Sequence, residues 1–458
     1  YYHPKHKAFL VVYVDDFKLA APAHLPGSKR DNIADVWALI QKHVEMDPPT
    51  GPGTFLGCKH ILTKVPCEGV PGGQVSVMEY DMEDQLQSAV DLYLEIVGDG
   101  RKLRDVKTPF RNSGTHNEAS LPLSSGPWLR CPWCKGEYDE KAFTRGTGDP
   151  SKQKGKKAEK DLLDPADIKK ADPAWKPLGE RAMRVLMKLL YAARLARYDL
   201  QRAINTLGSY VHRWNQECED DLYRLMCYVN SSLKVRQYAW VGDHPDDIDP
   251  HLYADADFAG CTSTSRSTNG VHLCLRGKNT YFSLSGTSKK QDCVSHSTPE
   301  AEIVAAAYAI RKEGLPSTYV WEFLLQSGKT RKIIIIFHED NMTMIRVVKS
   351  GRNPSMRHMG RTHYVQIKWL KERFEAGDLS LKFTPSAKQM ADIYTKPFDN
   401  AARWQTAQEN IAIVDKNSFM LNPKAFYKDL NKRINHEDDG EMYLDPHTKK
   451  FVECDSQQ

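Results

Sequence analysis

The sequence has no hydrophobic run long enough to cross a bilayer. Its apolar stretches Phe9–Val14 and Ile333–Phe337 are far shorter than the roughly 20 residues that a membrane-spanning helix needs. No basic leader followed by an apolar segment opens the chain, so we expect no secretory signal. The 10 Cys residues are scattered without the spacing of a disulfide framework. These absences predict an intracellular protein of a reducing compartment, without a membrane partner.

What the sequence contains is the composition of an ordinary soluble protein. Its 458 residues are 40% hydrophobic and 27% charged, enough for roughly two to four domains. The net charge of +5 is mild. A basic stretch between Lys152 and Lys160 is expected to be a solvated linker, with phosphate binding as the alternative. The chain begins with Tyr rather than Met, which indicates a fragment or a processed product.

Composition divides the chain into five segments. Residues 1–110 carry strand and helix patterns, whereas residues 111–178 are rich in Gly, Ser, Pro and Lys and are predicted to be a linker or insertion. Residues 179–249 have apolar side chains at helical spacing, which core packing explains. Residues 250–398 mix strand and helix patterns. Residues 399–458 form a tail whose role the pattern does not indicate.

The fourth segment predicts the fold class. Alternating apolar residues on either side of Arg276–Asn279 predict a hairpin that turns there. The elements that follow are a helix from about Pro299, a strand at Lys332–Phe337, a helix near Arg361–Glu375, a strand at Leu379–Phe383 and a helix from Lys388. This order predicts an α/β (α+β) domain, in which helices flank a mixed sheet.

Four acidic residues lie at unusual places in this pattern. Asp255 lies within strand sequence, where Asp is disfavoured, and Asp340 follows a buried strand directly. Glu302 lies one turn into a helix, and Asp392 lies at the start of another. Each alone has an ordinary explanation, such as an N-cap, a first-turn acid or a solvated strand end.

Taken together, the four acids predict a metal site. Carboxylates held side by side repel one another, and hard divalent cations relieve that repulsion. Two such cations roughly 3.5–4 Å apart clamp the attacking and leaving oxygens of a phosphoryl displacement. This chemistry requires neither Cys nor His.

A series of short motifs in this segment resembles the ribonuclease H (RNase H) domain of copia-type LTR retrotransposon Pol polyproteins. The motifs, in the order of that family, are Tyr253–Gly260, Arg266–Gly270, Ser288–Gln291, Ser297–Glu302, Glu339–Asn341 and Ala391–Pro397. The resemblance implies an RNase H-like fold and two Mg²⁺ ions, with Mn²⁺ as a substitute. It implies that Asp255, Glu302, Asp340 and Asp392 are the catalytic metal ligands. Asp257 and Glu300 compete for two of these roles.

The resemblance also implies contacts to nucleic acid. The candidates for binding the substrate are Arg266, Lys289, Lys290, Arg361 and His363. His363 is favoured as a structural or substrate-contact residue over a catalytic one. Two features depart from the family: the loop Thr384–Ala391 has no His before the last acid, and Pro299 opens the helix, which the fold tolerates.

A second resemblance lies near the N-terminus. Tyr13-Val14-Asp15-Asp16 lies between apolar runs and resembles the Tyr-x-Asp-Asp hairpin of reverse transcriptases, whose acids hold metals at the primer end. Adjacent acids also form ordinary turns. Short segments that resemble the copia-type polymerase follow at Phe55–Gly57, Lys107–Pro109 and Leu189–Arg194.

The resemblance makes residues 1–110 a partial palm and residues 179–249 a helical thumb or connection. The polymerase site of this family also needs an aspartate from an earlier palm strand, which the chain does not contain. We therefore expect no DNA polymerisation by this chain alone. A primer-extension assay with robust nucleotide incorporation would contradict this.

The linker-like segment carries one Cys-x-x-Cys motif, Cys131-Pro-Trp-Cys134. Zinc normally takes four ligands, so we do not expect zinc there. Residues that would complete a site, if folded nearby, are Cys58, His60, Cys67 and His116.

The leading hypothesis from the sequence is an Mg²⁺-dependent RNase H that cuts the RNA strand of RNA–DNA hybrids. Its partners would be the hybrid and template-primer nucleic acid, bound through the phosphate backbone. The resemblance places the protein in the cytoplasm, a virus-like particle or the nucleus. The alternatives are a decayed remnant that only binds nucleic acid and a nuclease of duplex DNA. The sequence carries no signal of the oligomeric state.

Overall fold

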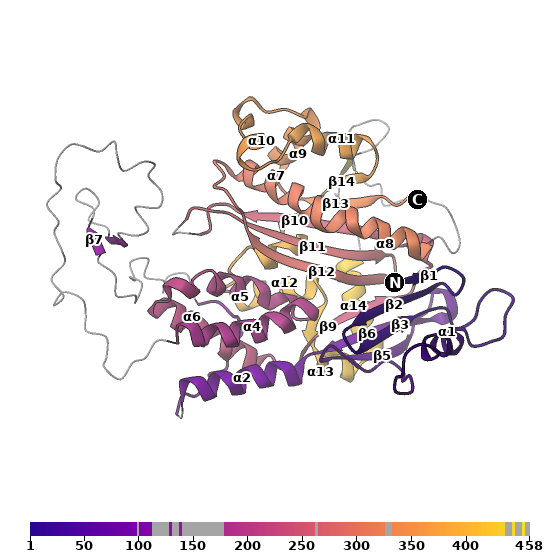
Figure 1. The fold of residues 1–458 in the computed structure, drawn as a ribbon. Coiled ribbons are helices and arrows are strands. Elements are labelled where there is room, and N and C mark those ends of the chain that lie inside the picture. The colour runs from indigo at the N-terminus through magenta and orange to yellow at the C-terminus, as the bar shows by residue number, and fades with distance from the viewer. Residues whose placement is uncertain are drawn as a thin grey trace.

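The computed structural model describes most of the chain (Figure 1). The described residues are 1–98, 100–111, 128–130, 137–139, 178–261, 264–325, 332–435, 442–444 and 451–453. Within these ranges no helix has the length and apolar character needed to span a membrane. The motif at Cys131 and Cys134 and the basic stretch between Lys152 and Lys160 lie outside the described residues.

One 12-stranded mixed sheet organises the fold, with neighbours in the order β17-β16-β14-β13-β10-β11-β12-β9-β6-β5-β4 and β15 paired to β9. Its strands are β4 Thr54–Phe55, β5 Cys58–Pro66, β6 Gln74–Asp81, β9 Val235–Val241, β10 Asp249–Asp257, β11 Thr268–Gly277, β12 Thr280–Lys290, β13 Ile335–Glu339, β14 Leu379–Phe383, β15 Ile413–Asp415, β16 Met442–Leu444 and β17 Phe451–Glu453. The prediction of a mixed sheet flanked by helices is therefore correct.

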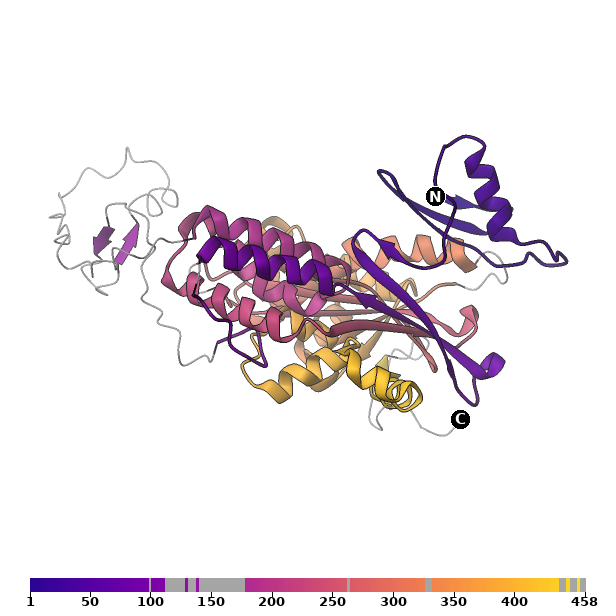
Figure 2. The ribbon, with the colours of Figure 1, turned by 90° about the horizontal axis from the view of Figure 1, so that it is seen from below.

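Helices cover both faces of this sheet (Figures 1 and 2). The helices of the described residues are α1 Asn32–Gln41, α2 Glu83–Val97, α4 Glu180–Leu195, α5 Gln201–Gly208, α6 Gln216–Ser231, α7 Thr298–Ala309, α8 Leu315–Leu325, α9 Met342–Ser350, α10 Met359–Thr362, α11 Ile367–Glu375, α12 Ala401–Asn410, α13 Lys416–Leu421 and α14 Pro423–Asn435. Of these, α1 lies beside the N-terminal strands rather than on the large sheet (Figure 2). Two smaller sheets are separate from the large one. The first has three strands, β1 Tyr2–His3, β2 Ala8–Tyr13 and β3 Asp16–Ala20, and the second has two, β7 Trp128–Arg130 and β8 Glu137–Asp139.

Successive residues of β10 point to opposite faces and build two cores. Leu252 and Ala254 pack in one core with α7, α9 and α11. Tyr253 belongs to the other core, which includes residues of α4–α6 and α12–α14. Figure 2 shows α8 and α12–α14 on opposite sides of the sheet.

Several predicted elements are confirmed and others are shifted. The hairpin turns at Lys278 and Asn279, because Gly277 pairs with Thr280, and β14 has the predicted bounds. The strand predicted from Lys332 begins only at Ile335. The predicted helix Arg361–Glu375 is split into α10 and α11, because Tyr364 takes a left-handed φ of 55° that ends a helix.

The last predicted helix is a 3₁₀ helix, η10, which spans Met390–Tyr394. Pro397 disfavours helical geometry at Lys396, which limits how far η10 can extend. The segment predicted to be helical at 179–249 ends in a strand, β9, which pairs with β6, β12 and β15. The large sheet therefore joins residues from four predicted segments, while the division into domains stays a prediction.

Candidate metal centre

Two neighbouring parallel strands carry the first two predicted acids. In the register of β10 and β13, Tyr253 lies opposite His338. Asp255 and Asp340 each follow two residues later. Since the carboxyl ends of parallel neighbours meet at one edge of a sheet, the two carboxylates lie side by side.

Gly270 allows the third acid to approach. It lies opposite Asp255 in the pairing of β10 and β11. A Cβ atom at this position would lie 2.6 Å from the carbonyl oxygen of Ala391 and 2.6 Å from Cγ2 of Thr395. The missing side chain therefore lets the η10 segment, with Asp392, pack directly on β11.

Three of the predicted ligands form one cluster. Carboxylate oxygens of Asp255, Asp340 and Asp392 all lie within 4.8 Å of one another. The Lys396 amine lies 2.6 Å from Asp392 Oδ2 and 3.8 Å from Asp255 Oδ1. The hydroxyl of Thr395 donates a hydrogen bond to Asp255. A cationic side chain thus lies against two of the acids.

Glu302 lies beside this cluster, although it is not within the group of three. It is buried, and the charges of Asp255 and Asp340 act on it. A further acid, Glu339, is fully buried and exerts the strongest neighbouring charge on Glu302. Sequence reasoning missed Glu339 and Lys396, although both lie inside motifs that it singled out.

Three buried oxygens of these acids have no hydrogen-bond partner: Glu302 Oε2, Glu339 Oε2 and Asp392 Oδ1. A buried acceptor without a partner is costly, and a divalent cation with oxygen ligands would satisfy it. The residues therefore fit an Mg²⁺ or Mn²⁺ ion.

The pKa values of these acids are shifted in the same direction. Burial, and then repulsion by Asp255, raises the pKa of Asp392 to about 8. Burial raises the pKa of Asp255, and burial with the neighbouring carboxylates raises the pKa of Glu302 and Glu339 well above the usual range. A bound cation would favour the ionised form of all four.

The two competing acids are engaged elsewhere. Asp257 forms an ion pair with Arg202, at 2.9 Å. Glu300 Oε1 lies 3.0 Å from Nε2 of His358 and 3.1 Å from Nε2 of His363. The structure therefore places Asp255 in the cluster of carboxylates rather than Asp257, and Glu302 beside it rather than Glu300.

Asp15 and Asp16 lie at a different place. They are exposed at the turn between β2 and β3, where Tyr13 pairs with Asp16. Among the described residues, neither belongs to a group of three or more side chains that could hold a metal.

The predicted substrate contacts are mostly at the surface. Arg266, Lys289 and Arg361 are exposed, and the Lys289 amine lies 5.2 Å from the centre of the Tyr308 ring. Lys290 is half-buried, with its amine 3.0 Å from Cys261 Sγ. The side chain of His363 is only 2% exposed and faces Glu300.

Gly270→Ala is expected to separate η10 from β11, because the neighbouring Ala391 carbonyl is backbone and cannot turn away. We expect the protein to lose about 1–3 kcal/mol of stability, as overpacked cores do. Mg²⁺ binding should weaken as well, since Asp392 moves. Urea unfolding and calorimetric Mg²⁺ titration measure both effects. In the control Gly208→Ala the new Cβ meets no atom within 4 Å, and equal losses in both variants would contradict the prediction.

The raised pKa values predict a pH dependence of the metal-free protein. A carboxyl whose pKa is higher in the folded state binds a proton more tightly there than in the unfolded chain. Its contribution to the free energy of unfolding therefore falls as pH rises. For Asp392 this contribution is complete below its ordinary pKa of 3.8 and is lost as pH rises through about 8. Metal-free protein should therefore lose stability between about pH 6 and about pH 9.

Mg²⁺ should reduce this loss, because it binds the ionised acids. Urea unfolding in EDTA and in Mg²⁺, at both pH values, measures the difference. Asp392→Asn should flatten the metal-free curve, and an unchanged slope would argue against the cluster as its cause.

Comparison with known proteins relates the chain to transposons. It is 25% identical over 231 residues to the retrovirus-related Pol polyprotein from transposon RE2 of Arabidopsis thaliana, which covers 50% of this chain and 15% of the relative. It is 26% identical over 214 residues to that from transposon TNT 1-94 of Nicotiana tabacum, covering 45% of this chain and 14% of the relative. An uncharacterised mitochondrial protein of Arabidopsis thaliana is 32% identical over 124 residues, 27% of this chain and 49% of that protein.

No protein-family model and no solved structure matches the chain. The chain spans about 15% of the length of the first of these relatives. Over about half of its own length, the chain is similar to retrovirus-related Pol polyproteins of plant transposons.

Proposed function

We propose that this chain contains an Mg²⁺-dependent RNase H that hydrolyses the RNA strand of RNA–DNA hybrids, as part of a copia-type Pol polyprotein. The observation that carries the proposal is the meeting of Asp255, Asp340 and Asp392 within 4.8 Å, from three separate elements. Glu302 lies beside them with an unsatisfied buried oxygen. Similarity to retrovirus-related Pol polyproteins supports a retroelement setting.

The order of elements supports the proposed fold. Strands β10, β11 and β12 pair antiparallel, while β13 and β14 add parallel strands beside β10. A helix, α7, follows the three antiparallel strands, and further helices separate β13 from β14. This agrees with the mixed order of strands and helices that the sequence pattern predicts for residues 250–398, the segment that resembles RNase H.

The cluster offers oxygen ligands of the kind that hydrolysis requires. The chemistry that bound divalent cations supply there is activation of a water and neutralisation of charge at the leaving oxygen. Asp255, Asp340 and Asp392 would hold the ions, with Glu302 completing the set. Lys396 competes with a cation for oxygens of Asp392 and Asp255, so it lowers the affinity of the site for the metal.

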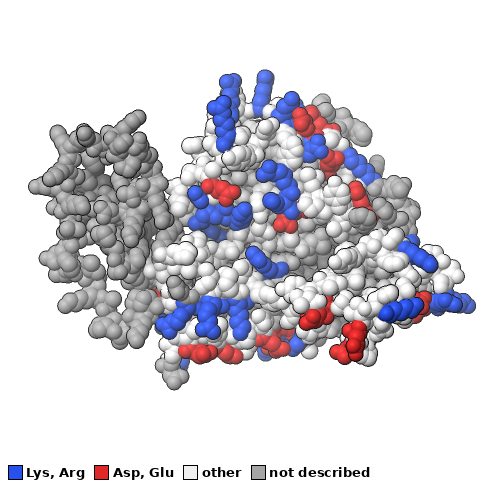
Figure 3. Space-filling view, viewed as in Figure 1, with Lys and Arg blue, Asp and Glu red and all other residues white. Residues whose placement is uncertain are grey.

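Cationic side chains support binding to a phosphate backbone. Figure 3 shows Lys and Arg gathered over α4, whose Arg181, Arg184 and Arg194 are exposed.

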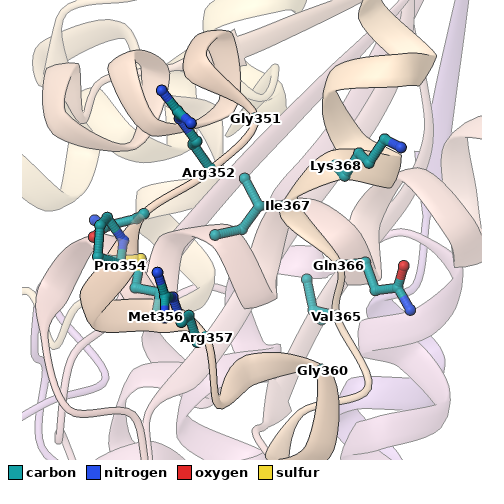
Figure 4. Close-up of a pocket in the computed structure, with 11 residues that line it drawn as sticks. Gly351, Arg352, Pro354, Met356, Arg357, Gly360, Val365, Gln366, Ile367 and Lys368 are labelled. Carbon is teal, nitrogen blue, oxygen red and sulfur yellow. The ribbon is translucent and has the colours of Figure 1, made fainter.

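A pocket of about 560 Å³ opens between the end of α9 and the α10–α11 region (Figure 4). Arg352, Arg357 and others line it, and none of the four predicted ligands does.

The test is cleavage of an end-labelled RNA–DNA hybrid by the full chain. We expect RNA fragments in Mg²⁺ or Mn²⁺ and none in EDTA. Duplex DNA of the same sequence should stay intact. Cleavage that is independent of divalent ions, or that prefers duplex DNA, would overturn the proposal.

A second candidate is a hybrid-binding protein without catalysis. The ion pair of 2.6 Å between Lys396 and Asp392 favours it, because a lysine already neutralises the acids. Hybrid binding without Mg²⁺ binding in calorimetry would support this candidate over the nuclease.

A further inference from the structure

A second group of metal-ligating side chains lies outside the carboxylate cluster. Ligand atoms of His296, Glu300 and His358 all lie within 4.8 Å of one another. They come from the loop after β12, the first turn of α7 and the residue before α10. His296 and Glu300 are neighbours in the sequence, and the fold brings the distant His358 to them.

A buried carboxylate forms the base of this group. Glu300 is 1% exposed, and its Oε1 lies 3.0 Å from His358 Nε2 and 3.1 Å from His363 Nε2. The His296 ring lies edge-on to that of His358, with centres 5.1 Å apart. His296 is exposed and the His358 side chain is 33% exposed, which leaves a path for an ion from solvent.

We propose that His296, Glu300 and His358 bind one transition-metal ion of the Zn²⁺ class. Two imidazoles and one carboxylate suit Zn²⁺, which binds nitrogen and oxygen donors and keeps a fourth position for water. Mg²⁺ instead prefers oxygen ligands, so the two sites select different ions.

His363 positions the carboxylate in this site. Its side chain is 2% exposed, and its Nε2 faces Glu300 Oε1. A ligand carboxylate is commonly oriented by such a partner, whose loss weakens metal binding without removing a ligand. His363 therefore acts through Glu300.

The site has a consequence for the carboxylate cluster. Glu300 and Glu302 belong to the same turn of α7, so an ion at Glu300 anchors the helix end that presents Glu302. It also holds α10 and the loop after β12 against α7. The proposed Zn²⁺ site depends only on His296, Glu300 and His358 and does not require hydrolase activity.

The experiment is calorimetric titration of Zn²⁺ into the full chain in excess Mg²⁺, which occupies carboxylate sites. Cys131→Ser and Cys134→Ser are included in every protein, so that these thiols do not contribute. We expect one Zn²⁺ site and a Zn²⁺-dependent rise in melting temperature. His296→Ala and His358→Ala should each lose the site, and His363→Ala should bind about 10–100-fold more weakly. His43→Ala, an exposed histidine of another region, is the control.

Melting curves without metal establish that each variant folds. His296 is exposed, so His296→Ala provides the test even where His358→Ala disrupts packing. Wild-type Zn²⁺ affinity in His296→Ala would overturn the proposal. Loss of the Zn²⁺ site in Asp392→Asn, with His296→Ala unaffected, would assign binding to the carboxylates and overturn it too. Failure of hybrid cleavage, by contrast, leaves this titration interpretable.

Discussion

Asp340→Asn is expected to lower the rate of Mg²⁺-dependent hybrid cleavage by at least about 100-fold. Loss of a residue that only hydrogen-bonds to a metal ligand costs up to about 100-fold, so loss of a ligand itself should cost at least as much. The side chain keeps its shape but loses the charge that, with Asp255 and Asp392, attracts the cation. Because Asp340 is half-buried, the substitution should leave the fold intact. Single-turnover cleavage and calorimetric Mg²⁺ titration measure the two losses.

Asp35→Asn is the matched control, since Asp35 is an exposed acid in the first turn of α1. It should cleave as wild type does. If Asp340→Asn retained residual cutting equal to that of the wild type, the catalytic assignment of the cluster would fail. Cleavage lost together with the melting transition would indicate misfolding, and Asp392→Asn would then be compared.

Asp199→Ala is expected to destabilise the protein by about 3–5 kcal/mol, the cost of breaking a buried ion pair. Arg197 and Asp199 are 1% and 0% exposed, and two nitrogens of the guanidinium lie 2.9 and 2.8 Å from the carboxylate oxygens. Tyr228 and Gln408 also donate to Asp199 Oδ2, at 3.1 and 3.0 Å. Removing the carboxylate leaves a buried cation and two buried polar groups without this acceptor.

The expected loss is measured by urea unfolding at neutral pH. Asp84→Ala is the comparison, because it breaks the solvent-exposed ion pair of Asp84 with Lys59, which water and salt screen. Its effect should be much smaller. Equal losses in the two variants would show that burial of the Arg197–Asp199 pair does not govern its contribution.

Local patterns in the sequence were enough to predict several elements. Alternation predicted a hairpin that turns within Arg276–Asn279, and the structure places the turn at Lys278 and Asn279. The strand β14 has the predicted bounds. Pro299 and the acids after it predicted the start of α7, which Ser297 caps. These features depend on residues close in the chain, so local sequence is sufficient. The break at Tyr364 was missed, because no Gly or Pro marks its left-handed φ.

Local sequence patterns did not reveal which distant residues meet in the fold. Asp257 and Glu300 were candidates for the metal site because each lies two residues from a predicted ligand. Only the fold places Arg202 beside Asp257, and His358 and His363 beside Glu300. The strand β9 was also missed, since its pairing with β6 and β12 joins distant segments.

The sequence by itself determined the mixed fold class and a short set of candidate acids, because strand alternation and strand-end acids are local signals. Only the tertiary structure decided which acids meet. Parallel pairing of β10 with β13 brings Asp255 to Asp340, and the missing side chain of Gly270 lets Asp392 join them. The fold also buries Asp392 beside Asp255, and no local pattern encodes this. Burial and the neighbouring carboxylate raise the pKa of Asp392 to about 8, although Lys396 acts in the opposite direction.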